Sequence, residues 1–198
     1  MTHEQQNRVL DFWFGSDPLK PLANKDLWFT KNPAFDEQIR SLFEAQVQQA
    51  KSGAFDDWAQ TPRGSLALLI LLDQFPRNIY RDQSAAFESD PKARKIAETA
   101  IARGFDEELS PIERCFMYLP LEHAEDLAAQ ETSVELFKSL AKKAEPDLRA
   151  MTQVTLDYAV RHRDVIKKFG RFPHRNSILN RVSTKAEVDF LATPNSSF

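Results

Sequence analysis

Residues 63–78 read RGSLALLILLDQFPRN and contain the strongest apolar segment of the chain. Every position from Leu66 to Leu72 is apolar, so the predicted helix 63–75 has no polar face over these residues. The segment is far shorter than the ~20 residues that a helix needs to cross a bilayer. It therefore predicts a buried helix at the centre of a globular fold, with its exit fixed by Phe75-Pro76.

Capping residues predict the starts of further helices. Asn32-Pro33, Asp90-Pro91 and Ser110-Pro111 each place a capping side chain before a proline, which suits the first turn of a helix. Glu113 follows Ser110 by three positions, and Glu187 follows Thr184 in the same way, the spacing of a capping box. The capping residues therefore indicate several short helices separated by turns.

The rest of the pattern is also helical, since no Val/Ile/Thr-rich alternating run indicates a strand. We predict an all-α, single-domain chain in which Pro120 breaks or kinks the path between two helices. Gly53, Gly104 and Gly170 fall where helices are expected to stop. The predicted helices are 4–14, 33–51, 63–75, 91–103, 111–119, 121–143, 147–169 and 185–191.

Composition limits the class of protein. The chain has 198 residues, 42% hydrophobic and 28% charged, which is ordinary for one globular domain. Its N-terminus lacks the layout of a secretory signal, and its one cysteine, Cys115, excludes an internal disulfide and a cysteine-rich metal cluster. A pI of 5.9 argues against general nucleic-acid binding. We expect a cytoplasmic protein without a membrane or nucleic-acid partner.

The segment 161–176, RHRDVIKKFGRFPHRN, departs from this acidic background. Six Lys and Arg side chains against Asp164 give it a net charge of +5, whereas the whole chain carries −3. It also holds His162 and His174, two of the four histidines. The segment is a candidate anion site, or alternatively a surface on which the acidic remainder of the fold docks.

Two histidines fall on predicted apolar stripes. His162 continues the 3-4 spacing that includes Met151 and Tyr158, and His123 extends the stripe of the helix 121–143 backward. Each is either a neutral core histidine with a hydrogen-bond partner or part of a shared polar pocket that includes Asp126. The aromatic pairs near the N-terminus are expected in the core, although Trp28 could wall a pocket.

The arginines allow two interpretations. Planar guanidinium groups suit carboxylate or phosphate recognition, but they also bond helix carbonyls and internal acids such as Asp73. Phe75-Pro76-Arg77-Asn78 resembles Phe172-Pro173-His174-Arg175-Asn176, and we expect both loops to converge on one anion-binding cleft. The candidate binding residues are Arg77, Asn78, His123, Asp126, His162, Arg163, Arg171, His174, Arg175 and Asn176.

No motif specifies a reaction. His162-Arg163-Asp164 matches a kinase tripeptide, but a Gly-rich loop and Asp-Phe-Gly are missing. Zinc-protease, di-iron and Walker spacings are also missing, and Cys115 is expected to be a buried hydrophobe. We therefore predict no cofactor and no metal.

Several motifs together resemble a bacterial family known as domain of unknown function 924. They are Val9–Phe14, Trp28-Phe29, Leu72–Asn78, His123–Asp126, Arg161–Asp164, Phe169–Asn176 and Ser196-Ser197-Phe198. The resemblance runs in order over nearly the whole chain. It implies an all-helical fold similar to tetratricopeptide-repeat proteins, and no established reaction, cofactor or catalytic residue.

Two functions remain open from the sequence. The first is a binding module whose Arg-, His- and Asn-lined groove holds an anionic small molecule or a peptide end. The second is a small-molecule enzyme with His123 or His162 as general acid or base. The binding module is favoured because nucleophile, metal and cofactor motifs are absent from the sequence.

Overall fold

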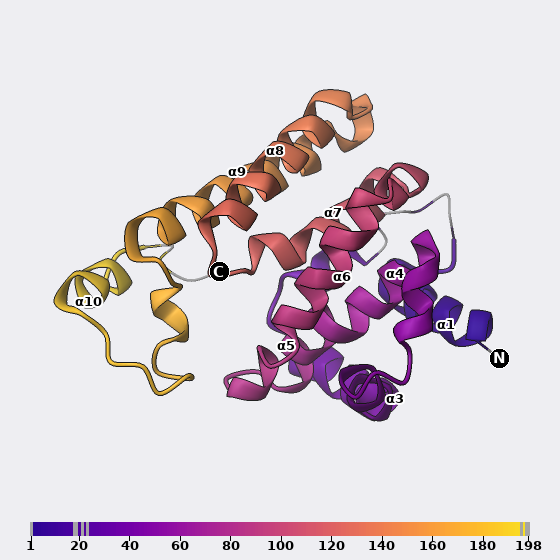
Figure 1. Cartoon of the computed structure of the whole chain (residues 1–198), viewed down its shortest axis with the longest axis horizontal. Coiled ribbons are helices and arrows are strands. Elements are labelled where there is room, and N and C mark those ends of the chain that lie inside the picture. Colours follow the sequence, from indigo (N-terminus) through magenta and orange to yellow (C-terminus); the bar gives the residue numbers. More distant parts are fainter. Residues whose placement is uncertain (1, 18–19, 21, 23, 195, 197–198) are drawn as a thin grey trace. The chain divides into compact units, whose positions relative to one another are not determined.

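The computed structural model describes residues 2–17, 20, 22, 24–194 and 196, and these residues form helices and turns without a β-strand (Figure 1). The all-α prediction is confirmed. Ser197-Phe198 of the family motif lies outside the described residues. The chain divides into two compact units, Met1–Arg81 with Ala85–Pro120 and Asp82–Ser84 with Leu121–Phe198. That both belong to a single domain stays a prediction.

The first unit is built around the apolar segment. Its helices are α1 (Thr2–Phe14), α2 (Lys25–Trp28), α3 (Pro33–Lys51), α4 (Pro62–Leu69), α5 (Phe75–Ile79), α6 (Asp90–Ala102) and α7 (Pro111–Glu122), whose last two residues belong to the second unit. Short 3-10 turns lie at Asp56–Gln60, Phe105–Glu108 and Ser84–Ala86, the last of which begins with a residue of the second unit. Every residue from Leu66 to Leu72 is at most 1% exposed, as predicted for a central helix.

The central helix does not end before Pro76. It widens into a π-helical turn over Ile70–Gln74 and continues as α5 to Ile79. Proline lacks the N–H that would bond the carbonyl of residue i−4, here Leu72. The buried hydroxyl of Ser89 donates to that carbonyl at 2.6 Å, so the missing backbone bond is replaced. The sequence pattern contains no sign of this replacement.

Aromatic side chains fill the space beside the central helix. Trp13 is fully buried and packs within 6.5 Å, between ring centroids, of Trp28, Phe75 and Phe116. The indole N–H of Trp28 donates to the Trp13 carbonyl at 2.8 Å. Trp28 is therefore a core residue, whereas Phe29 is 65% exposed.

The predicted caps are mostly confirmed. Asn32 accepts hydrogen bonds from two backbone N–H groups at the start of α3, and capping boxes form at Ser110 and at Thr184. Asp90 is an exception, because α6 begins with it and Ser89 takes the N-cap position. The Asp90 carboxylate pairs instead with Arg77.

The second unit contains a helical hairpin followed by a turn-rich segment. α8 (Leu127–Lys143) and α9 (Pro146–Phe169) run antiparallel and side by side (Figure 1). A left-handed Gly170 ends α9, and a 3-10 turn over Pro173–Arg175 and helix α10 (Lys185–Leu191) follow.

The predicted helix 121–143 is wrong at its start. α7 passes through Pro120 and ends at Glu122, and His123 lies in the connection rather than on a helix. Asp126 starts α8 by accepting a hydrogen bond from the Ala129 N–H at 2.9 Å. The buried Gln130 amide donates to the carbonyls of Glu122 and Ala124, at 2.5 and 2.8 Å, and so satisfies the end of α7.

Candidate functional site

The candidate residues of the first unit are held by internal acids. Arg77 makes a bidentate salt bridge with Asp90, with hydrogen bonds of 2.9 and 3.0 Å. It also lies 3.2 Å from the buried Asp73 carboxylate. Burial lowers the pKa of Arg77, but the two carboxylate charges outweigh burial and raise it. Asn78 donates to Asp36 at 2.8 Å. Of the two interpretations of the arginines, Arg77 fits pairing with internal acids.

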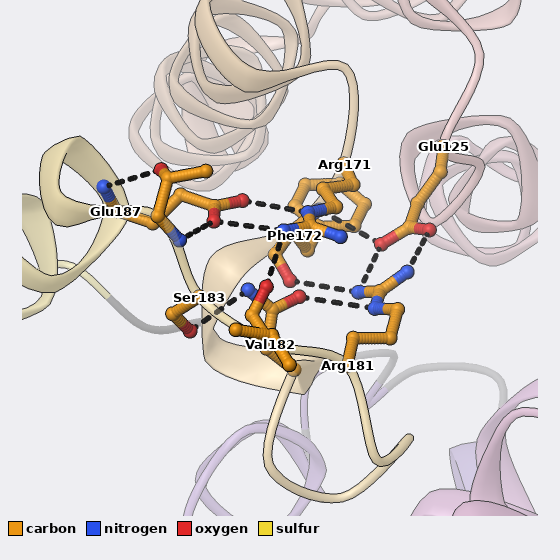
Figure 2. Close-up of polar contacts among 9 residues, drawn as sticks. Glu125, Arg171, Phe172, Arg181, Val182, Ser183 and Glu187 are labelled. Carbon is orange, nitrogen blue, oxygen red and sulfur yellow. Dashed lines mark hydrogen bonds and ion pairs between the residues drawn. The ribbon is translucent and has the colours of Figure 1, made fainter.

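In the second unit, Arg171 is bound to Glu187 (Figure 2). The two parallel bonds measure 2.6 and 2.8 Å, and the guanidinium also donates to the Val182 carbonyl at 2.9 Å. The Arg171 hydrogen bond and the Thr184 N–H lower the pKa of the Glu187 carboxyl to about 2. Arg171 therefore anchors the start of α10 to the segment after α9.

A second arginine–carboxylate pair, which the sequence did not indicate, lies beside the first. Arg181 donates to Glu125 at 2.6 and 2.9 Å, and Glu125 also accepts the Phe172 N–H at 2.8 Å (Figure 2). Burial raises the pKa of Glu125, but these donors outweigh burial and lower it. Asn176 accepts from Arg181 at 3.0 Å and donates to Ser183 at 3.0 Å. Asn176 therefore belongs to a structural network.

Only part of this network had a sequence signal. The capping-box spacing singled out Glu187, and its backbone role is confirmed. Its pairing with Arg171 across 16 positions, and that of Glu125 with Arg181 across 56, depend on tertiary folding. No periodic pattern reports such distant contacts.

His162 is buried, as predicted, on the inner face of α9. Its Nδ1 lies 2.8 Å from the Tyr158 carbonyl and 3.1 Å from the Glu122 carboxylate, so this nitrogen carries the proton when the ring is neutral. Burial lowers the pKa of His162 to about 2, against a smaller opposing contribution from the Tyr158 carbonyl. The imidazole is neutral at physiological pH.

Three histidines and one arginine gather around Phe172, and we call these five residues the Phe172 cluster. The His162 ring lies 5.5 Å and the His174 ring 5.6 Å from the Phe172 ring, and the His123 ring is 6.3 Å from that of His162. The buried Arg175 guanidinium lies over Phe172 at 4.5 Å and donates to the His123 carbonyl at 3.1 Å. His123 and His162 lie close together, as the shared-pocket alternative requires. The expected burial and helical position of His123 are wrong, because it is half-buried and lies in a turn.

Two candidate residues have local roles. Arg163 donates to its neighbour Asp164 at 2.7 Å, and Asp126 caps α8. Among the described residues, no three His, Cys, Asp or Glu side chains are grouped so that they could hold a metal ion. The same residues contain no helix long and apolar enough to span a bilayer.

The first unit has a surface cleft that the sequence did not predict. Its volume is about 380 Å³, and its lining includes Leu10, Asp11, Phe14, Arg63 and Glu113. Arg63 and Glu113 are paired at 3.0 Å, and Glu113 also accepts the Ser110 N–H. The clearest polar groups of the cleft thus already serve the start of α7.

The chain belongs to a family described as bacterial protein of unknown function, DUF924, whose model matches residues 9–195. A solved structure of a protein of unknown function from Agrobacterium tumefaciens is 38% identical, covers 97% of this chain and 99% of its own, and superposes with a TM-score of 0.84. No curated protein matches the chain. The family resemblance noted in the sequence is confirmed.

Proposed function

We propose that the protein is a binding module that takes an anionic small molecule or a peptide carboxyl terminus at the Phe172 cluster. One observation carries the proposal: the buried Arg175 guanidinium lies over the Phe172 ring, which the rings of His162 and His174 also contact, and it donates to the His123 carbonyl. Guanidinium and imidazole N–H groups are strong donors to carboxylate and phosphate oxygens. His123 and His174 are half-buried residues, so the cluster reaches the surface of the second unit.

The proposed site is smaller than the set of residues that the sequence suggested. Arg77, Arg171 and Asn78 donate to internal carboxylates, and Asn176 donates to Ser183, so their donors are already used in the folded chain. Arg175 is buried, lies over the Phe172 ring and donates to the His123 carbonyl. The convergence of both Phe-Pro loops on one cleft stays a prediction.

The enzyme hypothesis has less support. An effective general base needs a pKa near the working pH, and burial takes the pKa of His162 to about 2. The nearby Glu122 carboxylate orients the ring, but the Tyr158 carbonyl does so as well. Both contacts are those of a neutral core histidine.

Thermal unfolding tests the proposal. Phosphate, sulfate, citrate and a short acetylated peptide with a free carboxyl terminus are each titrated at constant ionic strength. A ligand that binds only the native state stabilises it by about 2.7 kcal/mol at a hundred times its Kd. We expect at least one of these anions to raise the Tm of the wild type but not that of Arg175→Gln. The control Arg149→Gln, which removes an exposed arginine of α9, should show the same rise as the wild type. An unmoved wild type, or equal shifts in both variants, rejects the site.

A further inference from the structure

Helix α9 has an apolar stripe on the side that α8 leaves uncovered. Its buried side chains include Thr152, Ala159 and Ile166. Val154 is nevertheless 53% exposed and Tyr158 44% exposed. The sequence pattern placed Tyr158 in the core, so its exposure is unexpected. Large apolar side chains that recur at helical spacing on a surface mark a contact surface when they adjoin one another.

The stripe extends over about two turns. Half-buried Met151 and Thr155 lie one helical step from Val154 and Tyr158, at 3-4 spacing. We call Met151, Val154, Thr155 and Tyr158 the α9 stripe. No residue of the stripe belongs to the Phe172 cluster, so the two surfaces can be tested separately.

Opposite charges flank the stripe at equal distances. Asp147, exposed in the first turn of α9, lies seven positions before Val154, and Arg161 lies seven positions after it. At 1.5 Å per residue, each charge is about 10 Å from Val154 along the helix axis. The Arg161 guanidinium lies over the Tyr158 ring at 4.8 Å, so the basic end adjoins the apolar residues.

We propose that the α9 stripe pairs with the α9 stripe of a second copy of this chain, antiparallel, about a two-fold axis near Val154. In that arrangement Val154 meets its own counterpart, and Met151 of one copy lies beside Tyr158 of the other. Asp147 of each copy comes within a turn of Arg161 of the other copy. The surface is therefore complementary to itself, which is the requirement for a two-fold interface.

Charge complementarity favours a second copy over a membrane or an unrelated peptide. A membrane-binding helix has basic residues along its polar face, but this stripe carries an acid at one end and a base at the other. A single helix pair buries less than the ~1,200 Å² of a standard stable interface, so the dimer is weak and depends on concentration.

Charge reversal tests the register. Sedimentation velocity is measured up to the limit of solubility on the wild type, Asp147→Arg, Arg161→Asp and the double variant. Each single reversal places like charges opposite each other twice and should weaken dimerisation about tenfold. The double variant restores both pairs and should recover the wild-type constant. A monomeric wild type, or a double variant as weak as the single ones, overturns the proposal.

Cross-linking tests the axis with a matched control. Under mild oxidation, Val154→Cys should form a disulfide-linked dimer, because the two copies of this position face each other. Gln153→Cys, one residue round the helix and also exposed, should remain monomeric. Both variants keep the buried Cys115, which serves as an internal reference. Equal cross-linking at 153 and 154, or none at 154, rejects the antiparallel pair.

Discussion

Two segments with nearly the same sequence, 75–78 and 172–176, fold in different ways. In the first, the helix continues through Pro76, because a π-helical turn precedes it and Ser89 bonds the carbonyl that the proline leaves. In the second, Gly170 has already ended α9 with a φ of 70°, and Pro173 opens a 3-10 turn. The residues before the motif, not the motif itself, determine the backbone.

The arginines of the two segments differ accordingly. Arg77 lies between the carboxylates of Asp73 and Asp90. Arg175 lies on the Phe172 ring and donates to a carbonyl. The arginine of one Phe-Pro motif is thus an ion-pair partner of two acids, and the arginine of the other lies over an aromatic ring.

The largest expected effect comes from removing the ion pairs of Arg77. Arg77→Met removes the cation from two carboxylates, one of them only 1% exposed, and should destabilise the fold by about 3–5 kcal/mol. Urea unfolding measures the change. Arg63→Met, which removes an arginine that is 54% exposed, should cost about 1 kcal/mol or less. If Arg175→Met costs as much as Arg77→Met, the contrast between the two arginines is wrong.

A smaller effect tests how the helix passes Pro76. Ser89→Ala leaves the buried Leu72 carbonyl without its hydroxyl donor and should cost about 1–3 kcal/mol in urea unfolding. Pro76→Ala provides a backbone N–H for the same carbonyl, so the double variant should be less destabilised than the sum of the two single changes. Additive costs would show that Ser89 does not replace the missing bond.

The sequence predicted what depends on local spacing. The capping boxes at Ser110 and Thr184, the buried apolar helix and the burial of His162 all follow from residues within a few turns of one another. It failed at the start of α8, where two local signals compete. The apolar stripe extends back to His123, but the Asp126 carboxylate caps the helix, and the Gln130 amide donates to the Glu122 carbonyl at the end of α7.

The candidate site shows the same limit. A shared pocket of His123 and His162 was one alternative, and their rings are 6.3 Å apart, although His123 lies in a turn and not on the predicted helix. The sequence could not tell that Arg171 is bound to Glu187 while Arg175 lies on a ring, because those contacts join residues brought together only by folding. A basic segment therefore predicts where cations lie, but not which partner each of them contacts.

His162, in the second unit, makes the fold sensitive to acid. The pKa of His162 is lowered from 6.5 to about 2 in the folded chain, so the unfolded chain binds the extra proton between these values. Stability is therefore lost as the pH falls below about 6.5, by about 1 kcal/mol at pH 5.5. His162→Gln should lose less free energy of unfolding between pH 7.5 and 5.5 than the wild type does. His3→Gln, at an exposed position, should lose as much free energy of unfolding over this pH range as the wild type. If His162→Gln also loses as much as the wild type, the acid sensitivity does not come from His162.

The smallest expected effect is at Gly170, which ends α9 just before the second Phe-Pro segment. Gly170 has a φ of 70°, and a Cβ added there would meet no atom within 4 Å, so Gly170→Ala should cost about 1 kcal/mol from backbone strain alone. Gly104, in the first unit, has a φ of 73° and equally open space, and Gly104→Ala should cost a similar amount in urea unfolding. Only the change at 170 should also alter the NMR signals of Phe172 and of the histidines around it, because Gly170 directs the chain into the 3-10 turn that carries His174 and Arg175. If Gly170→Ala is neutral and leaves those signals unmoved, a left-handed residue is not what ends α9, and the different course of the two Phe-Pro segments must arise from the carboxylates around Arg77 instead.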